Sequence, residues 1–230
     1  QEKSSFPSVP FVHHSNKTNF IGRHHGNSNY DFIGLLDDAR IYERALSAQE
    51  IAQLVEFANY RFWDNQGADG LGNTPANWSG DILPDANDTL VFETNSADVT
   101  WGDLNAAHGL ELRQGFTHNV SISHGLTLTG NYVQATGAGL TLGLDSTTDG
   151  EHGQIAAVNI TLGGRLTLID SIASGVHSFN LFKASGTLSG QFEDIILPKL
   201  DAGYAWDLSA IYTNGIVKMI PAPGAIAVNP

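Results

Sequence analysis

The sequence predicts an all-β protein, and three observations support this prediction. Glycine is abundant, at 25 of 230 residues, and charged residues make up only 15%. Threonine, serine, asparagine and aspartate are frequent, which is typical of short strands joined by turns. Short runs of alternating apolar residues recur between residues 101 and 180, whereas a single segment has the apolar spacing of a helix.

The alternating runs share the unit Gly-Leu-Thr-Leu, or Gly-x-Leu-x-Leu in its looser form. Examples occur at 109–112, 125–128, 139–142 and 164–168, and Val-Ser-Ile at 120–122 is related. Their spacing is irregular, so this is a degenerate repeat. Each unit is too short to bury its own apolar face, and only stacking of many units gives a continuous core. Residues 59–220 are therefore predicted to form an irregular β-solenoid or a β-sandwich-like module around one core.

The predicted helix follows a strand near residues 36–41. Ser47 is a candidate N-cap, and Glu50, three residues later, completes a capping box. Ile51, Leu54 and Val55 supply the apolar stripe of a short helix.

This strand and helix belong to a longer motif. The string FIGLLDDARIYERALSAQEI, residues 32–51, resembles the end of a laminin-G-like domain with the concanavalin A-type jelly-roll fold. Asn19-Phe20-Ile21-Gly22 is similar to the strand that precedes it in that family. The resemblance implies that residues 1–58 are the C-terminal part of such a domain, with partial jelly-roll strands and a short helix.

A second resemblance covers the rest of the chain. The sequences Asn77-Trp78, Leu83-Pro84 and DTLVF at 88–92, together with FNLF at 179–182 and LPKL at 197–200, resemble bacterial autotransporter-associated β-strand modules. Residues 221–230 are similar to the start of a PEP-CTERM-type sorting tail. These resemblances imply a secreted protein associated with the bacterial cell surface, and none of them implies a reaction.

Charge and composition restrict the partners. Lys and Arg number 11 against 24 Asp and Glu, so the formal net charge is −13, which repels nucleic acid and anionic lipid. Cysteine is absent, which excludes disulfides and thiolate metal sites. No run approaches the roughly 18 apolar residues of a membrane span. Cations, neutral glycans and other proteins remain as expected partners.

Calcium is the one cofactor with candidate ligands. In laminin-G-like relatives the residue matching Asp37 often helps to hold a structural Ca²⁺, so the resemblance implies the same here. Asp69 lies in the acidic turn 64–70, which lacks the Glu that an EF-hand loop requires at its last position. The pairs His13-His14 and His24-His25 offer one imidazole to each face of a strand, which does not make a chelate.

Trp63, Trp78 and Trp101 are candidate glycan contacts, because an indole face suits a pyranose ring. For Trp63 and Trp78, which lie within the motifs that resemble bacterial surface modules, core or rim packing is the favoured interpretation, whereas Trp101 lies outside those motifs. No catalytic residues are predicted, since neither a G-x-S-x-G elbow nor an H-E-x-x-H helix is present.

The sequence therefore favours a non-catalytic structural or adhesive surface protein that assembles through β-sheet contacts. Strands of residues 1–58 with unpaired edges would recruit other strands, so self-association into filaments, or pairing with another surface protein, is expected. One alternative is a carbohydrate-binding module. The other is a β-solenoid enzyme that degrades polysaccharides.

Overall fold

A computed structural model of the chain describes residues 42–47, 59–93, 97–101 and 106–223. The chain divides into two compact units, Gln1–Ala48 and Gln49–Pro230. The jelly-roll strands expected in residues 1–41 and the helix expected after Ser47 lie outside the described residues. The described architecture is that of residues 59–223.

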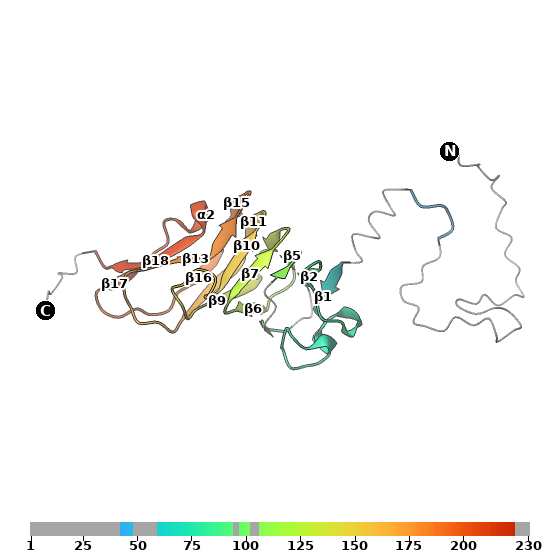
Figure 1. The fold of residues 1–230 in the computed structure, drawn as a ribbon, viewed down its shortest axis with the longest axis horizontal. Helices are drawn as coiled ribbons and strands as arrows, with labels where there is room; N and C mark the ends of the chain where they lie inside the picture. The colour runs from blue at the N-terminus through green and yellow to red at the C-terminus, as the bar shows by residue number, and fades with distance from the viewer. Residues whose placement is uncertain (1–41, 48–58, 94–96, 102–105, 224–230) are drawn as a thin grey trace, which may run out of the picture. The chain divides into compact units, whose positions relative to one another are not determined.

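Three parallel sheets form the body of this second unit (Figure 1). Sheet A contains β1 (Tyr60–Phe62), β2 (Thr89–Phe92), β5 (Gly109–Leu112), β8 (Tyr132–Gln134), β11 (Ile160–Leu162) and β15 (Leu188–Gly190). Sheet B contains β3 (Val99–Thr100), β6 (Asn119–Ile122), β9 (Gly139–Leu144), β12 (Arg165–Asp170) and β16 (Asp194–Ile196). Sheet C contains β4 (Ala106–Ala107), β7 (Gly125–Leu128), β10 (Gln154–Ala157) and β14 (Phe182–Ala184).

The chain visits the three sheets in rotation, so that β5, β6 and β7 make one turn and β8, β9 and β10 make the next. Each strand pairs in parallel with its counterpart one turn later, as Leu110 does with Tyr132 and Val120 with Leu140. Successive turns therefore stack as a solenoid. The all-β fold class predicted from the sequence is confirmed.

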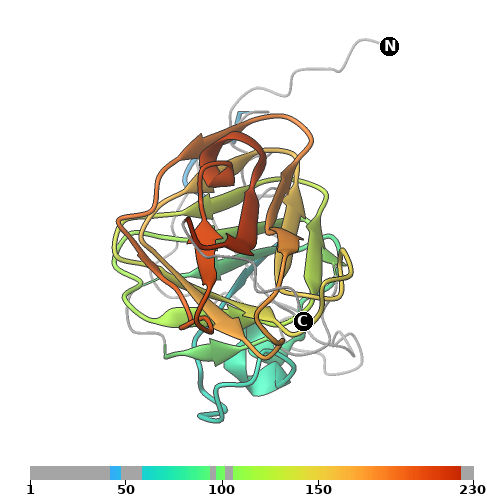
Figure 2. The same cartoon turned by 90° about the vertical axis from the view of Figure 1, so that its left-hand side faces the viewer.

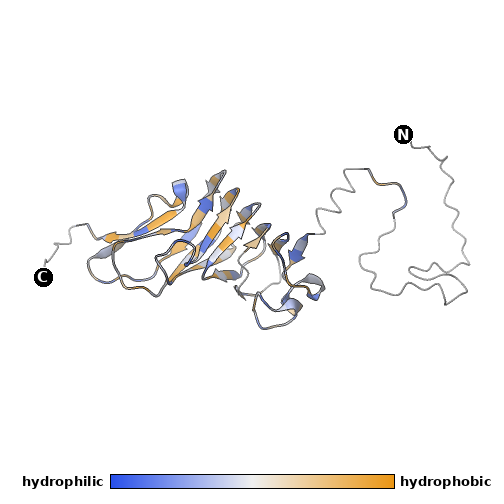
Figure 3. Ribbon diagram, viewed as in Figure 1, coloured by the Kyte–Doolittle hydropathy of each residue, from blue (hydrophilic) through white to orange (hydrophobic). Residues whose placement is uncertain are grey.

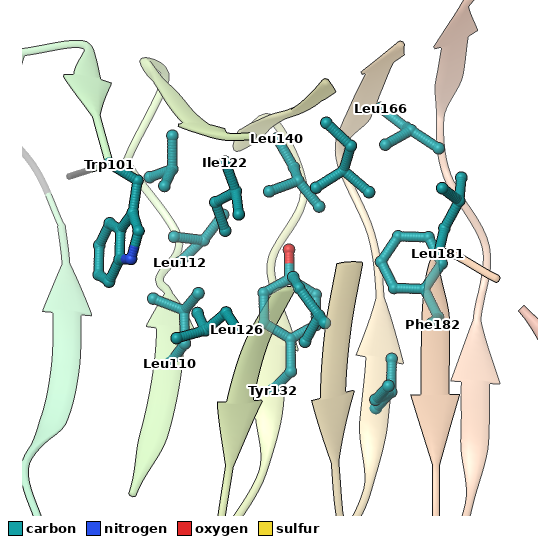
Figure 4. Packing of buried hydrophobic residues seen from close by; sticks show 14 of the residues in the cluster. Trp101, Leu110, Leu112, Ile122, Leu126, Tyr132, Leu140, Leu166, Leu181 and Phe182 are labelled. Atoms are coloured by element: carbon teal, nitrogen blue, oxygen red, sulfur yellow. The ribbon is translucent and has the colours of Figure 1, made fainter. Parts of the chain in front are cut away.

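The Gly-Leu-Thr-Leu units form strands of this solenoid, and their leucines are buried in both β7 and β9, although Thr141 of β9 is buried as well. In β7 both leucines are buried and the intervening Thr127 is exposed. The inward side chains of all three sheets meet in one apolar core that follows the axis (Figure 4). Hydrophobic residues recur in strand after strand along the solenoid (Figure 3). Leu110, Leu126 and Leu140, one from each sheet, are at most 1% exposed.

A polar ladder joins the turns at the corner between sheets C and A. The side-chain Oδ1 of Asn131 accepts hydrogen bonds from the backbone N–H and the Nδ2 of Asn159, at 3.2 and 3.0 Å. One turn later the Oδ1 of Asn159 accepts from the backbone N–H and the hydroxyl of Thr187, at 3.1 and 2.9 Å. Stacked amides of this kind hold neighbouring turns in register.

The loop between β1 and β2 covers the N-terminal end of the solenoid. This loop includes the short 3-10 helices η2 (Pro75–Asn77) and η3 (Ser79–Asp81). Its residues Gly70 and Gly72 hydrogen-bond to both sides of Thr100 in β3, at 2.9 and 3.0 Å. The strand edge of β3 is thereby paired within the chain.

An antiparallel sheet covers the C-terminal end. It contains β13 (His177–Asn180), β18 (Ile216–Pro221) and β17 (Tyr204–Asp207), and the helix α2 (Ile211–Asn214) precedes β18. Phe179, Val217 and Met219 from this sheet are fully buried. Figure 2, viewed from this end, shows the cap strands lying across the turns behind them. Terminal caps are what allow a solenoid to end without exposing its core.

Candidate functional site

A hollow of about 280 Å³ lies on the outer face of sheet B, where its strands end. We call it the hydroxyl groove. Its lining comes from the neighbouring strands β3, β6, β9 and β12 and the residues that follow them. The groove therefore crosses several turns of the solenoid rather than following one strand.

Hydroxyl side chains line this groove because of the alternation along each strand. Thr100 pairs with Ser121, and Ser121 with Thr141, so that three hydroxyl residues lie side by side. Thr100 is exposed and Ser121 is partly exposed, whereas Thr141 is only 4% exposed and forms the inner part of the row. The amide of Asn119 donates to the Thr141 hydroxyl at 2.5 Å, which fixes one end of this row. Hydroxyls both donate and accept hydrogen bonds, so the row suits a ligand that does the same.

A glycine makes the depression. Gly143 of β9 pairs with Ile169 of β12, and the nearest atoms to its absent Cβ belong to Ser123, at 3.4 and 3.5 Å. No side chain therefore stands between Ser123 and Ile169. Ile169 is 57% exposed and gives the groove an apolar wall, and Asp145 is the one charged residue in the lining.

Trp101 lies at the N-terminal end of the groove and is one of its lining residues. Its backbone N–H bonds to the carbonyl of Ser121 at 2.8 Å, so it continues the pairing of β3. The indole is only 7% exposed, because it packs against Trp78, with ring centroids 6.3 Å apart. It contributes an edge of the groove and not an open stacking face.

Trp63 and Trp78, the other two candidate glycan contacts, belong to the core. They are 4% and 0% exposed, and their rings meet edge to face at 5.1 Å. The Trp78 indole N–H donates to the carbonyl of Gly72 at 2.9 Å. Neither indole therefore presents a face to a sugar, and core packing describes both residues.

Asp69, a calcium candidate, holds the N-terminal loop together. Its carboxylate accepts hydrogen bonds from the Thr74 hydroxyl at 2.6 Å, the Leu71 N–H at 2.9 Å and the Asn77 amide at 2.5 Å. The hydrogen bond from Thr74 is the largest of the causes that lower the pKa of Asp69, and those from Leu71 and Asn77 act in the same direction. Asp37 lies outside the described residues, as do the two histidine pairs. Weak calcium binding at Asp37 or Asp69 stays a prediction.

Within the described residues, no three histidine, aspartate or glutamate side chains gather where they could hold one metal ion. The hydroxyl groove brings together hydroxyls, an isoleucine and an indole edge. What this arrangement offers is hydrogen bonding combined with apolar contact, which is how proteins hold uncharged polar ligands.

The sequence identified Trp101 but missed the groove itself. Ser121 and Thr141 belong to the repeat units 120–122 and 139–142, and Gly143 comes directly after the second unit. The period of two in Gly-Leu-Thr-Leu was a usable signal, because it places the threonine on the outer face whenever the leucines are buried. Which turns lie beside one another could not be deduced, since the repeat spacing is irregular.

One comparison with known proteins gave a match. The profile of the concanavalin A-like lectin/glucanases superfamily matches residues 1–52. No curated protein and no solved structure matches the chain. Among the described residues, no helix has the length and apolar character needed to cross a membrane.

Proposed function

We propose that this chain is a non-catalytic, extracellular adhesive protein that binds neutral carbohydrate. The hydroxyl groove is the observation that supports this function. A row of hydroxyls beside an apolar wall offers a sugar both hydrogen bonds for its hydroxyls and contact for its C–H faces. The strands behind the row are firmly held, because β6, β9 and β12 are each paired on both sides and packed on a continuous core.

Charge favours a neutral ligand over an acidic one. Asp145 is the sole charged residue in the groove lining, and the formal net charge of the chain is −13. An acidic glycan would meet repulsion from both. A neutral glycan meets none.

The match of residues 1–52 supports the same ligand class, because the family description names lectins and glucanases. Binding is favoured over hydrolysis at the groove. Glycoside hydrolysis commonly requires a pair of carboxyl groups on either side of the scissile bond, and Asp145 is the single carboxylate among the lining residues. The resemblance of residues 59–230 to bacterial surface modules supports an extracellular location.

Self-association is a second part of the proposal, and it concerns residues 1–58. Within the solenoid, the β1–β2 loop pairs with the edge of β3, and the antiparallel sheet covers the other end. These contacts disfavour the addition of strands at β3 and over the antiparallel sheet, whereas β1 and β16 are the terminal strands of sheets A and B. The proposed assembly by sheet contact uses the strands expected in residues 1–58.

The test is electrophoresis of the intact chain through native gels that contain a neutral polysaccharide, such as soluble β-glucan, hydroxyethyl cellulose or dextran. We expect at least one of them to retard the chain, and polygalacturonate to have no such effect. Gly143→Val should weaken the apparent affinity by about tenfold or more, because its methyl groups fill the hollow. A tenfold loss corresponds to about 1.4 kcal/mol.

Thr127→Val is the matched control, because Thr127 is an exposed outward residue on a different sheet. This variant should migrate like the unchanged chain. If no neutral polysaccharide retards the chain, the proposed function is wrong. If Gly143→Val and Thr127→Val are retarded equally, the hydroxyl groove is not the site.

A further inference from the structure

A second hollow, of about 430 Å³, lies at the corner between sheets A and B. We call it the corner groove. Gln114 follows β5, Thr136 follows β8, Gly163 follows β11 and Gln191 follows β15, and all four residues line it. The groove thus crosses four successive strands of sheet A. At about 4.8 Å per strand, it extends for about 15 Å along the solenoid axis.

Backbone alone forms part of its floor. A Cβ at Gly163 would lie 2.3 Å from the carbonyl oxygen of Gln134, and a Cβ at Gly164 would lie 2.1 Å from that of Ala138. No other residue fits at either position without moving the turn below. The close contact between turns therefore keeps this part of the groove free of side chains.

The walls carry uncharged hydrogen-bonding groups. Gln114, Thr136, Thr161 and Gln191 are all exposed, and their amides and hydroxyls can both donate and accept. Val133, 38% exposed, adds an apolar contact. Glu193 is the one charged residue in the lining, and its Oε2 accepts a hydrogen bond from the Gly137 N–H at 3.0 Å, which ties two separate turns together.

We propose that the corner groove is a second carbohydrate site, which holds a neutral glycan chain lying along the solenoid axis. The ligand class rests on the proposed function, whereas the site does not depend on the hydroxyl groove. The length of the groove fits several sugar units rather than one ring. Its lining contains no cationic side chain, and Glu193 disfavours an acidic glycan.

A polypeptide is the less suitable occupant. Extended peptides commonly bind by adding a strand to a free sheet edge. The strands β8 and β11 beneath the groove are interior strands, paired with β5 and β15 on either side. A peptide lying here would find no row of unpaired backbone groups, whereas a glycan needs only the side chains.

The two grooves lie at opposite ends of the strands of sheet B. The corner groove includes Gly164, which comes directly before β12, whereas the hydroxyl groove includes Ser171, which comes directly after it. Two sites on one rigid body can engage two chains of a polysaccharide or two stretches of one chain. Such bivalent binding raises the apparent affinity well above that of either site.

Thr161→Trp tests the site, because an indole on the outer face of β11 would fill the corner groove. Thr127→Trp is the matched control, since Thr127 is likewise an exposed threonine in the middle of a strand. Both variants should melt at similar temperatures. In gels containing the neutral polysaccharide that retards the unchanged chain, Thr161→Trp should lose about tenfold or more in apparent affinity, and Thr127→Trp should lose nothing. Combining Thr161→Trp with Gly143→Val should abolish retardation.

If the unchanged chain is retarded and Thr161→Trp behaves like Thr127→Trp, the corner groove is not a site, while the proposed function stands. If no neutral polysaccharide retards the unchanged chain, both proposals fail. If gelatin retards the chain and Thr161→Trp abolishes that effect, the groove binds polypeptide and the carbohydrate assignment is overturned.

Discussion

Replacing Gly164 by alanine should destabilise the solenoid by about 3 kcal/mol or more, among the larger effects expected of a single substitution. Two causes add. The φ angle of Gly164 is +53°, a region that costs an alanine about 1–2 kcal/mol. The new Cβ would also lie 2.1 Å from the Ala138 carbonyl oxygen, so two turns would have to move apart. Urea unfolding followed by tryptophan fluorescence measures the loss.

Gly137→Ala separates these two causes. Gly137 also has a positive φ angle, +81°, but no atom lies within 4 Å of where its Cβ would be. This variant should lose only the backbone contribution of about 1–2 kcal/mol. Equal losses for the two variants would show that the turns are not in close contact at Gly164.

Trp78→Ala should cost about 3–5 kcal/mol of unfolding free energy, as expected when a buried aromatic residue is truncated. Trp78 is fully buried and its ring contacts those of Trp63, Phe92 and Trp101, with centroids 5.1 to 6.3 Å apart. The substitution also removes the hydrogen bond to the Gly72 carbonyl. Because this cluster closes the N-terminal end, its loss should expose the first turns.

Trp206→Ala is the comparison for this prediction. Trp206 is half-buried in the antiparallel cap, and its indole N–H likewise donates to a carbonyl, that of Pro198, at 2.9 Å. Its truncation should be clearly less destabilising than that of Trp78. A loss below about 1 kcal/mol for Trp78→Ala would mean that the aromatic cluster does not hold the N-terminal cap.

The repeated strands were predictable from the sequence, because local pattern decides them. Gly-Leu-Thr-Leu at 125–128 and 139–142 alternates with a period of two, and the structure makes both segments strands with buried leucines. Because each unit is too short to bury its own apolar face, the sequence also predicted that many units must stack. One continuous core resulted, as expected.

The ends and the grooves were not predictable, because long-range pairing decides them. Nothing local to Trp63 and Trp78 shows that a loop folds back to bury both against Phe92. Likewise, nothing local to Gly143 shows that Ile169 lies beside it. The number of residues in one turn of the solenoid differs from turn to turn, so the pairing partner cannot be counted from the sequence. The sequence pattern does not tell which residue of one turn pairs with which residue of the next turn.

Amide chemical-shift mapping would show whether neutral carbohydrate binds on the outer wall of the solenoid. The intact chain, labelled with ¹⁵N, would be titrated with an oligosaccharide cut from the polysaccharide that retards it in gels. We expect the largest shifts on residues of the two grooves, such as Ser121, Gly143 and Thr161. Shifts confined to residues outside both grooves, or no shifts at millimolar oligosaccharide, would contradict it.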